Sequence, residues 1–490
     1  MITTLADLLP LLPLLIATAT TIVAMTAIAI RRNYALTAGI TIAGLLIASL
    51  VAASMMSTTN SQVTPLLIVD QYSLFFTVLT CVTAMLIAIF SFPYLANLDD
   101  SKEEYYLLLG IATIGAIVMV SSNHFVSTIL GLETLSMSLY GMVAYPVHSK
   151  LADKFPLEAS VKYLVLSAAA SGILLFGMAL IYAQTGTLEF SSIVNVTKET
   201  PGLGAGFSIV ALIMVFIGIA FKLSLAPFHM WTPDVYEGSP LPATTYLATI
   251  GKSAMFVVLL RLIVMTEALS FDSIILVISL VAIVSILAGN LLALLQDSLK
   301  RILAYSSIAH MGYLLIALVA SYYVQGTISV EAVTFYLFAY MVMSVGAFGV
   351  ISIVSSSEKE FDDIDDYQGL FWRNPWLAAV FTGMLLSLAG IPLTVGFIGK
   401  FYLFFAGVEA GLWILLAVLI IGSGVGLYYY LRIVYRMLLS PKDGEGFKSG
   451  GSQHMGSHGV LAFVLALLLI LGVYPTPLVS IIETISLNIL

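Results

Sequence analysis

One glutamate and three lysines stand inside long apolar stretches of this chain. They are Glu133, Lys222, Lys252 and Lys400, and each falls near the middle of a segment about long enough to cross a bilayer. A charge at that depth costs at least about 2.5–3.5 kcal/mol, so intramembrane ionisable residues are candidates for ion or proton pathways. His310 lies about half-way along a further apolar segment. We therefore expect five groups at similar depth on different helices, as a proton relay in the membrane plane requires.

The types of these residues suit proton transfer. Burial in a low-dielectric site favours the neutral form of a lysine, and a nearby carboxylate favours its charged form. Movement of Glu133 toward or away from Lys222 would therefore switch Lys222 between holding and releasing a proton. Histidine titrates near neutral pH, which makes His310 a natural intermediate station.

Composition excludes a soluble protein. The 490 residues are 60% hydrophobic and only 9% charged, whereas soluble proteins carry about 25% charged residues. The net charge of −8 is spread over loops and implies no nucleic-acid partner. The single cysteine, Cys81, excludes an intrachain disulfide, an iron–sulfur cluster and a Cys-based zinc site. No nucleotide-binding glycine motif is present either, so we expect neither a cofactor nor a metal in this chain.

The apolar segments predict an all-α membrane protein with fourteen spans. Two of them, 206–236 and 374–406, are too long for one crossing and contain Pro227 and Pro392, so we interpret them as broken helices. The other predicted spans are 7–30, 35–54, 72–97, 105–121, 124–147, 160–183, 241–265, 272–295, 301–321, 331–355, 410–438 and 459–486.

The loops differ in their content of lysine and arginine, which predicts orientation. One set of alternate loops holds little beyond Lys198 and Arg261. We expect the opposite, basic set to be cytoplasmic, and an even number of spans then puts both termini on the periplasmic side. The basic set comprises Arg31, Arg32, Lys102, Lys150, Lys154, Lys300, Arg301, Lys359, Arg373, Arg432, Arg436, Lys442 and Lys448.

Alternative interpretations of the polar residues stay open. A buried Glu133–Lys222 pair could simply lock two helices together, and His310 could be a hydrogen-bonded core histidine. Lys162 and His229 lie nearer the predicted cytoplasmic ends of their spans. There they could form a point of proton uptake, or reach the interface as ordinary polar residues.

A weak internal repeat relates the two broken spans. Ser-Leu-Ala at 224–226 precedes Pro227, and Ser-Leu-Ala at 387–389 precedes Pro392. The two spans are five apart and therefore cross the membrane in opposite directions. Broken helices in matching positions of inverted repeats indicate a transport site.

Three longer motifs carry a resemblance to a known family. They are FKLSLAPFHMWTPDVY at 221–236, KRILAYSSI at 300–308 followed by His310, and SLAGIP at 387–392 followed by GKFY at 399–402. In these motifs the chain resembles the antiporter-like membrane subunits of respiratory complex I, most closely the N-type subunit of the bacterial NADH:quinone oxidoreductase. The related Mrp-type cation/proton antiporters share many of the motifs.

The resemblance implies fourteen helices with two inverted five-helix repeats, each containing a broken helix. Three N-terminal helices would occupy 1–98, the repeats 104–266 and 271–440, a flexible cytoplasmic loop 441–458, and a last helix 459–490. By position in the motifs, Glu133 would tune Lys222, Lys252 would connect the repeats, and Lys400 would be the terminal charge. Lysine at that last position suits the N-type, and the absence of a lateral helix before Leu490 is expected to exclude the L-type.

The resemblance also implies a function. We expect a proton-translocating subunit without a redox centre of its own, in the inner membrane of a bacterium. NADH, FMN, iron–sulfur clusters and quinone would belong to partner subunits, and a neighbouring antiporter-like subunit and small membrane subunits would contact this chain in the bilayer. An Mrp-type antiporter subunit and a purely structural membrane subunit are the alternatives.

Overall fold

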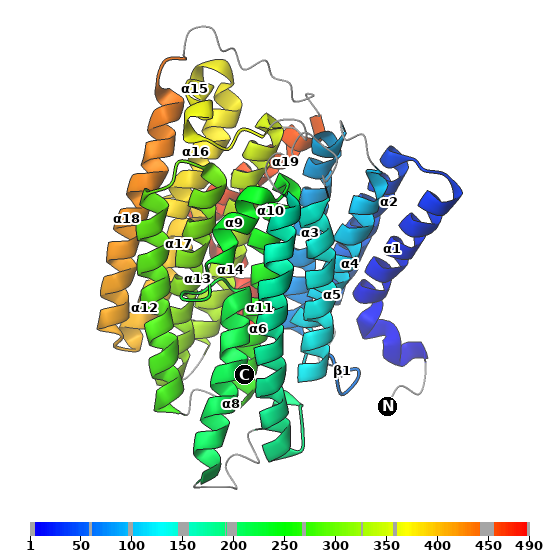
Figure 1. Ribbon diagram of the computed structural model, residues 1–490, viewed down its shortest axis with the longest axis vertical. Helices are drawn as coiled ribbons and strands as arrows, with labels where there is room; N and C mark the ends of the chain where they lie inside the picture. Colours follow the sequence, from blue (N-terminus) through cyan, green and yellow to red (C-terminus); the bar gives the residue numbers. More distant parts are fainter. Residues whose placement is uncertain are drawn as a thin grey trace.

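The computed structural model is almost entirely helical, with long helices running along the vertical axis of Figure 1. It describes residues 5–57, 61–96, 101–145, 156–191, 193, 203–266, 271–324, 327–355, 360–441 and 455–487. Most of the predicted loop 441–458 lies outside these ranges, and α19 already begins at Met455. Also outside are Lys150, Lys154, Lys198, Lys359, Lys442 and Lys448.

The elements of the first part of the chain include the first broken helix, α8 and α9. They are η1 Leu5–Leu11, α1 Leu12–Ile30, α2 Tyr34–Met55, β1 Ser61–Gln62, β2 Ile68–Val69, α3 Gln71–Leu95, α4 Glu103–Val120, α5 Phe125–Ala144, α6 Pro156–Thr185, α8 Leu203–Lys222, α9 Trp231–Gly238, α10 Leu241–Tyr246, the π-helical turn η3 Leu247–Gly251 and α11 Lys252–Thr266. The strands β1 and β2 form a short antiparallel pair, with Ser61 opposite Val69.

The elements of the second part include the second broken helix and end with two apolar helices. They are α12 Asp272–Leu294, α13 Leu299–Tyr323, α14 Ile328–Val354, η5 Ile364–Tyr367, α15 Leu370–Arg373, α16 Pro375–Ala389, α17 Val395–Glu409, α18 Trp413–Leu438, α19 Met455–Val473 and α20 Thr476–Ser486.

Twelve helical segments in the described ranges are long and apolar enough to cross a membrane. Two of the fourteen predicted crossings are missing from that number because they are broken: α8 and α9 replace the span 206–236, and α16 and α17 replace 374–406. The predicted class, a polytopic helical membrane protein, is confirmed. The division into two inverted repeats stays a prediction.

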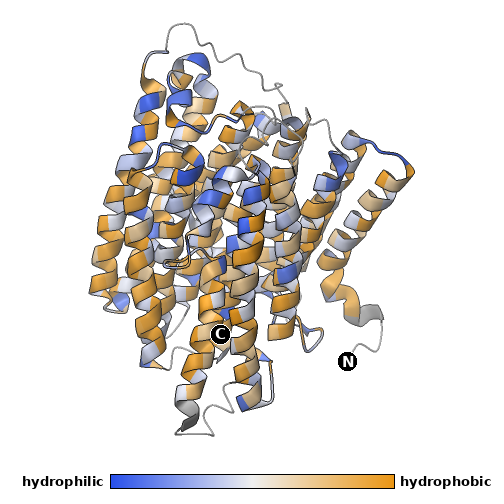
Figure 2. Cartoon of the chain, viewed as in Figure 1, coloured by the Kyte–Doolittle hydropathy of each residue, from blue (hydrophilic) through white to orange (hydrophobic). Residues whose placement is uncertain are grey.

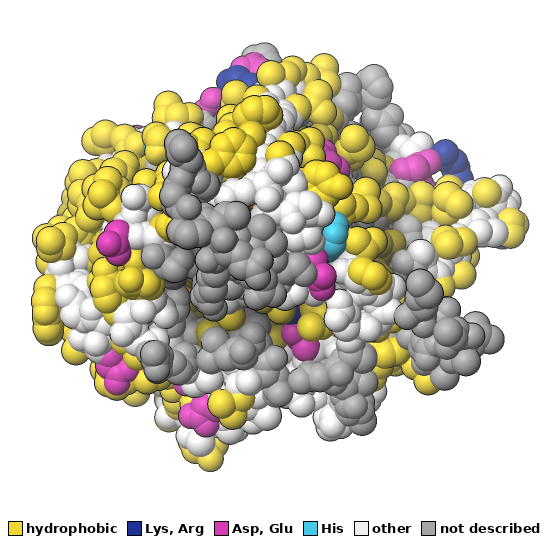
Figure 3. All heavy atoms as spheres, turned by 90° about the horizontal axis from the view of Figure 1, so that it is seen from below, with side chains coloured by type: hydrophobic (Ala, Val, Ile, Leu, Met, Phe, Trp, Pro, Cys, Tyr) yellow, Lys and Arg dark blue, Asp and Glu magenta, His cyan; other side chains and the backbone are white. Residues whose placement is uncertain are grey.

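Polarity is distributed as a membrane protein requires. Hydrophobic residues dominate the flanks of the long helices, and hydrophilic residues gather toward the upper end in Figure 2. The loop between α1 and α2, with Arg31 and Arg32, and the end of α18, with Arg432 and Arg436, lie at that upper end (Figure 1). Seen from below, hydrophobic side chains form most of the visible rim, with scattered acidic residues between them (Figure 3).

The first break follows from Pro227, which cannot donate the backbone hydrogen bond that would continue α8. The chain turns through Ser224, whose φ is +62°. Backbone groups freed by the break are satisfied by distant partners: the indole of Trp231 donates to Phe221 O at 3.1 Å, and Ala226 N donates to Ser285 Oγ at 2.9 Å. The break is therefore a built feature that leaves Lys222 as the last residue of α8.

The second break uses different residues for the same purpose. Gly390, with φ +88°, ends α16 in the left-handed conformation that glycine adopts most easily. Gly396 N donates to Ser387 Oγ at 3.0 Å across the break. The ammonium of Lys400 donates to Ala389 O at 2.8 Å, so this lysine itself satisfies a carbonyl at the end of α16.

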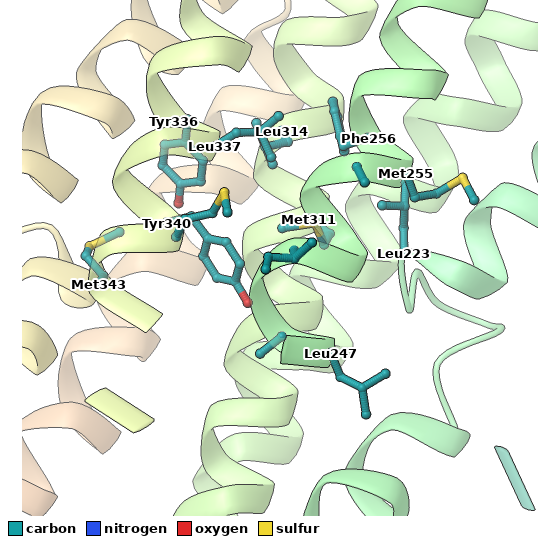
Figure 4. Packing of buried hydrophobic residues seen from close by; sticks show 14 of the residues in the cluster. Leu223, Leu247, Met255, Phe256, Met311, Leu314, Tyr336, Leu337, Tyr340 and Met343 are labelled. Atoms are coloured by element: carbon teal, nitrogen blue, oxygen red, sulfur yellow. The ribbon is translucent and has the colours of Figure 1, made fainter. Parts of the chain in front are cut away.

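The core is centred on α13 and α14. Nearly every residue of α13 from Leu299 to Ala320 is buried, although α13 is one of the membrane-spanning helices. Figure 4 shows Met311 and Leu314 of α13 packed among Tyr336 and Tyr340 of α14 and Phe256 of α11. Polar side chains on α13 therefore lie inside the protein and away from lipid.

Two buried ion pairs fasten the ends of the core helices. Arg261 of α11 is fully buried and donates to both carboxylate oxygens of Asp70, at 2.8 and 3.0 Å, while Asp70 also caps the N-terminus of α3. Lys300 is likewise buried and pairs with Glu360, which also accepts hydrogen bonds from Tyr94 and the backbone of Leu241. The sequence predicts loop charges at Arg261 and Lys300; both instead lie inside, because acidic partners distant in the sequence neutralise them.

Replacement of Arg261 by methionine tests the ion pair between Arg261 and Asp70. It leaves Asp70 buried and unpaired, so we expect a loss of about 3–5 kcal/mol of stability. The double variant Asp70→Asn/Arg261→Met should lose clearly less, because asparagine needs no counter-charge and still caps α3. Thermal unfolding of the purified protein measures both.

Arg32→Met is the matched control, because Arg32 pairs with Glu104 at the exposed surface. Its expected effect is about 0–1 kcal/mol. Equal losses for Arg261→Met and Arg32→Met would contradict the importance of the buried pair.

Candidate functional site

Lys222 lies at the C-terminal end of α8 with two serine hydroxyls around its ammonium group. It donates to Ser136 Oγ of α5 at 2.8 Å and to Ser167 Oγ of α6. Ser167 also accepts a hydrogen bond from the hydroxyl of Tyr140 at 2.6 Å. The lysine nitrogen stands 5.9 Å from the centre of the Tyr163 ring, within cation–π range. Lys222 is buried, and it interacts with hydroxyls and a ring rather than with a carboxylate.

Glu133 is connected to this lysine indirectly. Its carboxylate accepts a hydrogen bond from Ser171 Oγ at 2.6 Å, and no ion pair within 4.0 Å joins it to Lys222. Glu133 and Ser136 are three residues apart on α5, and Ser171 and Ser167 are four apart on α6, so each pair lies on one helix face. Two serine-lined steps therefore separate the carboxylate from the ammonium group. Glu133 itself is half-buried.

Lys252 begins α11 directly after the π-helical turn η3. A π-turn within a helix often marks a functional site, because it redirects side chains and loosens the backbone ladder. The ammonium of Lys252 donates to Ser307 Oγ of α13, and the hydroxyl of Tyr340 donates to the same oxygen at 2.9 Å. Figure 4 shows the Tyr340 side chain pointing from α14 toward the η3 segment. The ring of Tyr236 lies 5.6 Å from the lysine nitrogen.

His310 lies one helical turn beyond Ser307 on α13 and is buried between two tyrosines. Its Nδ1 is 2.6 Å from the hydroxyl of Tyr336, and its Nε2 is 3.3 Å from the hydroxyl of Tyr430. Tyr430 also shares a hydrogen bond with Ser306. The arrangement joins α13, α14 and α18 through groups that can each donate or accept a proton.

Lys400 lies at the second break and is partly exposed. In addition to Ala389 O, its ammonium donates to Ser423 Oγ of α18 at 2.9 Å. The ring of Tyr313 is 5.4 Å from the lysine nitrogen, and the hydroxyl of Tyr313 accepts a hydrogen bond from Asn290 at 2.9 Å. Lys400 is therefore linked to α12, α13 and α18 from its position on α17.

The three lysines share one kind of environment. Each donates to at least one serine hydroxyl, and each has a tyrosine ring within 5.9 Å of its nitrogen. None has a carboxylate within 4.0 Å in the described part of the chain. A serine hydroxyl can accept from an ammonium group or donate to a neutral amine, whereas a carboxylate favours the charged form alone. The sites are thus compatible with gain and loss of a proton.

Lys162 and His229 differ from each other. Lys162 is at the surface, where it forms ion pairs with Glu158 at 2.9 Å and Asp234 at 3.2 Å. His229 is buried, and none of the described side chains forms a hydrogen bond with its ring nitrogens, which lie near the backbone of Pro227. His229 lies within the first break, between α8 and α9, and Lys162 of α6 reaches α9 through Asp234. Of the two residues, only His229 has buried nitrogens without a side-chain partner, as a proton acceptor below the surface would need.

The structure brings the predicted residues into three polar groups. Glu133 and Lys222 share serines of α5 and α6; Lys252 and His310 are joined through neighbouring residues of α13; Lys400 lies beside Tyr313 on the same α13. No hydrogen bond between described side chains links the Lys222 group to the Lys252 group, or the His310 group to Lys400.

The serine and tyrosine hydroxyl groups that surround the charged residues are not evident from the sequence. Tyr429 and Tyr430 are typical packing aromatics in the sequence, yet both are buried and hydrogen-bonded, to Asn290 and to Ser306 respectively, while Tyr428 is exposed. Ser307 also gave no signal of its own. The only hint was the spacing of Ser306, Ser307 and His310, which puts them on about one turn of helix.

The described residues contain no group of three or more His, Cys, Asp or Glu side chains that could hold a metal ion.

Three solved structures have the same fold over nearly the whole chain. A chain of respiratory complex I from Thermus thermophilus, solved with bound aureothin, is 29% identical, with a TM-score of 0.81 and 96% of this chain and 98% of that chain covered. A chain of the membrane-bound sulfane sulfur reductase, an archaeal respiratory membrane complex, is 24% identical, with a TM-score of 0.83 and coverage of 99% and 97%. A chain of the Mrp complex from Dietzia sp. DQ12-45-1b is 20% identical, with a TM-score of 0.83 and coverage of 99% and 98%.

A family match covers the residues of the candidate site. Residues 122–426 match the family described as "NADH:quinone oxidoreductase/Mrp antiporter, TM", and this range contains Glu133, Lys222, Lys252, His310 and Lys400. It spans more than half of the 490 residues. The protein is a multi-pass, antiporter-like membrane subunit that belongs to the NADH:quinone oxidoreductase/Mrp antiporter transmembrane family.

Proposed function

We propose that this chain is a proton-translocating membrane subunit of respiratory complex I, of the N-type. The observation that carries the proposal is the set of three lysines, Lys222 and Lys252 buried and Lys400 partly exposed, that have no carboxylate within 4.0 Å among the described residues and donate to serine hydroxyls. Lysines that only locked helices together would be expected to pair with acids, as Lys300 pairs with Glu360. Cations held by hydroxyls suit proton exchange and contribute little as clamps.

The order of exposure supports transfer across the subunit. Glu133 on α5 and Lys400 on α17 are partly exposed, whereas Lys222, Lys252 and His310 between them are buried. The two ends of the series can therefore exchange charge or protons with neighbouring subunits or water, and the middle is shielded from lipid. This is the pattern expected of a chain of groups within a membrane arm.

In the first half, Glu133 sets the protonation of Lys222. Displacement of the carboxylate toward the lysine, through the serine steps on α5 and α6, favours the ammonium form; displacement away favours the neutral amine. The C-terminal end of α8 also stabilises the ammonium form through the helix dipole. A shift in the position of the carboxylate thus releases or recovers one proton.

In the second half, a proton released by Lys222 reaches Lys252 and passes through Ser307 and His310 toward Lys400. Serine and tyrosine hydroxyls next to these groups can accept one proton while donating another. Lys400 then releases the proton to the far side of the membrane. His229, beneath the surface near the first break, is the proposed point of uptake, with Lys162 at the surface above it.

The partners and location follow from the same proposal. The basic ends of the helices face the cytoplasm, both termini lie on the periplasmic side, and the membrane is the inner membrane of a bacterium. A neighbouring antiporter-like subunit and small membrane subunits contact the chain. NADH, FMN, iron–sulfur clusters and quinone act in other subunits, whose electron transfer supplies the energy.

An Mrp-type antiporter subunit is the second candidate. The Mrp chain matches the fold over nearly its whole length. The identity of 29% with the complex I chain, against 20% with the Mrp chain, favours the first candidate. Co-purification decides between the two: flavin- and iron–sulfur-containing subunits accompany a complex I subunit and do not accompany an Mrp subunit.

Lys222→Ala tests the proton path in membrane vesicles that carry the intact complex. We expect donor-driven acidification and coupled turnover to fall by about a hundredfold or more, because a positioned proton-transfer group contributes at least that much. A native gel checks assembly, and Lys102→Ala, at the surface end of α4, is the matched control. If pumping per electron is unchanged in an assembled Lys222→Ala complex, the path through Lys222 is wrong and the buried lysines are structural.

Tyr430→Phe tests the hydroxyl steps around His310. It removes the group that bonds both His310 and Ser306, so we expect proton transfer to slow by roughly tenfold, the equivalent of one buried hydrogen bond of about 1.4 kcal/mol. Tyr428→Phe changes an exposed neighbour in the same helix and should have no effect. The acidification rates of the two variants are measured side by side. Equal rates would contradict the role of Tyr430.

A further inference from the structure

A cavity of about 560 Å³ opens beside the C-terminal part of α18. It shares no lining residue with the lysine sites. Charges of both signs line it: Asp297, Asp363 and Asp365 on one side, and Arg432 and Arg436 of α18 on the other. Its volume is within the roughly 300–1,000 Å³ of typical small-molecule sites. A lining with both signs fits a ligand that itself carries both.

The wall opposite α18 is held in place by the backbone. Ser298 and Asp363 form an isolated antiparallel bridge, and Ile364 N donates to Asp297 O at 3.0 Å. The guanidinium of Arg432 donates to Gln296 O at the end of α12 and so fixes one arginine against this wall. The backbone on the acidic side of the cavity is therefore fixed by hydrogen bonds, while the side chain of Asp297 is 79% exposed.

The arginines retain capacity to bind an anion. Arg432 Nη1 is 3.6 Å from Asp297 Oδ1, and Arg436 Nε is 3.4 Å from Asp365 Oδ1. Charge-assisted hydrogen bonds of this kind are normally about 2.7–2.9 Å long, so both contacts are loose. A phosphate oxygen would satisfy such donors, because arginine binds phosphate with several parallel N–H groups.

An apolar and aromatic stripe on α18 includes two residues of the cavity wall, Tyr428 and Tyr435. Tyr428, Leu431, Tyr435 and Leu438 are exposed and recur every three or four residues, so they lie on one face of the helix. The helix is one of the candidate membrane spans. Exposed tyrosines at the end of a span are typical of the level at which lipid headgroups meet acyl chains. The cavity thus lies where a headgroup would be, with a surface for the chains beside it.

We propose that this cavity binds a phospholipid with a primary ammonium headgroup, of the phosphatidylethanolamine type. Arg432 and Arg436 hold the phosphate, the carboxylates of Asp297 and Asp363 accept from the ammonium, and the acyl chains lie along the α18 stripe. Three carboxylates against two guanidinium groups disfavour an anionic headgroup. A choline headgroup lacks the N–H donors that the carboxylates require.

Site-specific photo-crosslinking in the intact complex tests this site. The complex, with Tyr435 replaced by benzoylphenylalanine, is reconstituted in vesicles of equal parts phosphatidylethanolamine, phosphatidylcholine and phosphatidylglycerol with matched acyl chains. After illumination, mass spectrometry identifies the adducts. We expect the phosphatidylethanolamine adduct to exceed each of the others roughly tenfold, the effect of one charge-assisted hydrogen bond. The same probe at Trp413, exposed at the opposite end of α18, should capture the three lipids equally.

Two pairs of substitutions distinguish the roles of the charges. Arg432→Gln/Arg436→Gln should lower phosphatidylethanolamine capture by roughly tenfold. Asp297→Asn/Asp363→Asn should instead shift the preference toward phosphatidylglycerol. Arg31→Gln, an exposed arginine at the same end of the molecule, is the matched control and should change nothing.

Three outcomes would overturn the proposal. Equal capture of the three lipids at Tyr435 would show a nonspecific lipid contact. An adduct with a peptide of another subunit would make the cavity part of a protein interface. No adduct at Tyr435, while the Trp413 probe reacts, would exclude a bound lipid.

Discussion

The structure depends on the stabilisation of lysine ammonium groups in an apolar interior, without acidic partners among the described residues. Broken helices supply much of that stabilisation. Lys222 is the last residue of α8, and Lys400 binds a carbonyl at the end of α16, so each ammonium lies at the negative end of a half-helix. Serine hydroxyls supply further acceptors. The interruptions of the two spans therefore create the lysine sites as well as the bends.

The central helix α13 organises the rest. Because lipid does not reach it, α13 can carry Ser307, His310 and Tyr313 on consecutive turns, and these contact Lys252, Tyr430 and Lys400 respectively. The two buried ion pairs, by contrast, lie toward the ends of the helices that surround it. Charges that fasten the fold and charges that remain available for proton exchange thus occupy different levels and have different partners.

Much of this could be predicted from the sequence, for identifiable reasons. The membrane class follows from composition, and Pro227 and Pro392 indicate where the two spans break, although Gly390 is the residue that ends α16. Arg261 and Lys300 were predicted wrongly as loop charges, since a basic residue near the end of an apolar run usually reaches the interface. Their partners lie 191 and 60 residues away and become evident only in the fold.

The charged residues of the site could be predicted from the sequence, but the serine and tyrosine hydroxyls around them could not. Charged residues in apolar segments are rare enough to stand out. Serine and tyrosine are ordinary in membrane helices, so nothing in the sequence separates Tyr430, bonded to His310, from its exposed neighbour Tyr428.

The most direct test of the relay is a structure of the intact complex at a resolution that locates water. A relay requires ordered water molecules, each with two or more polar partners, in the two intervals that no hydrogen bond between described side chains crosses: between Lys222 and Lys252, and between His310 and Lys400. Close-packed apolar side chains and no water in either interval would contradict a proton path through these residues.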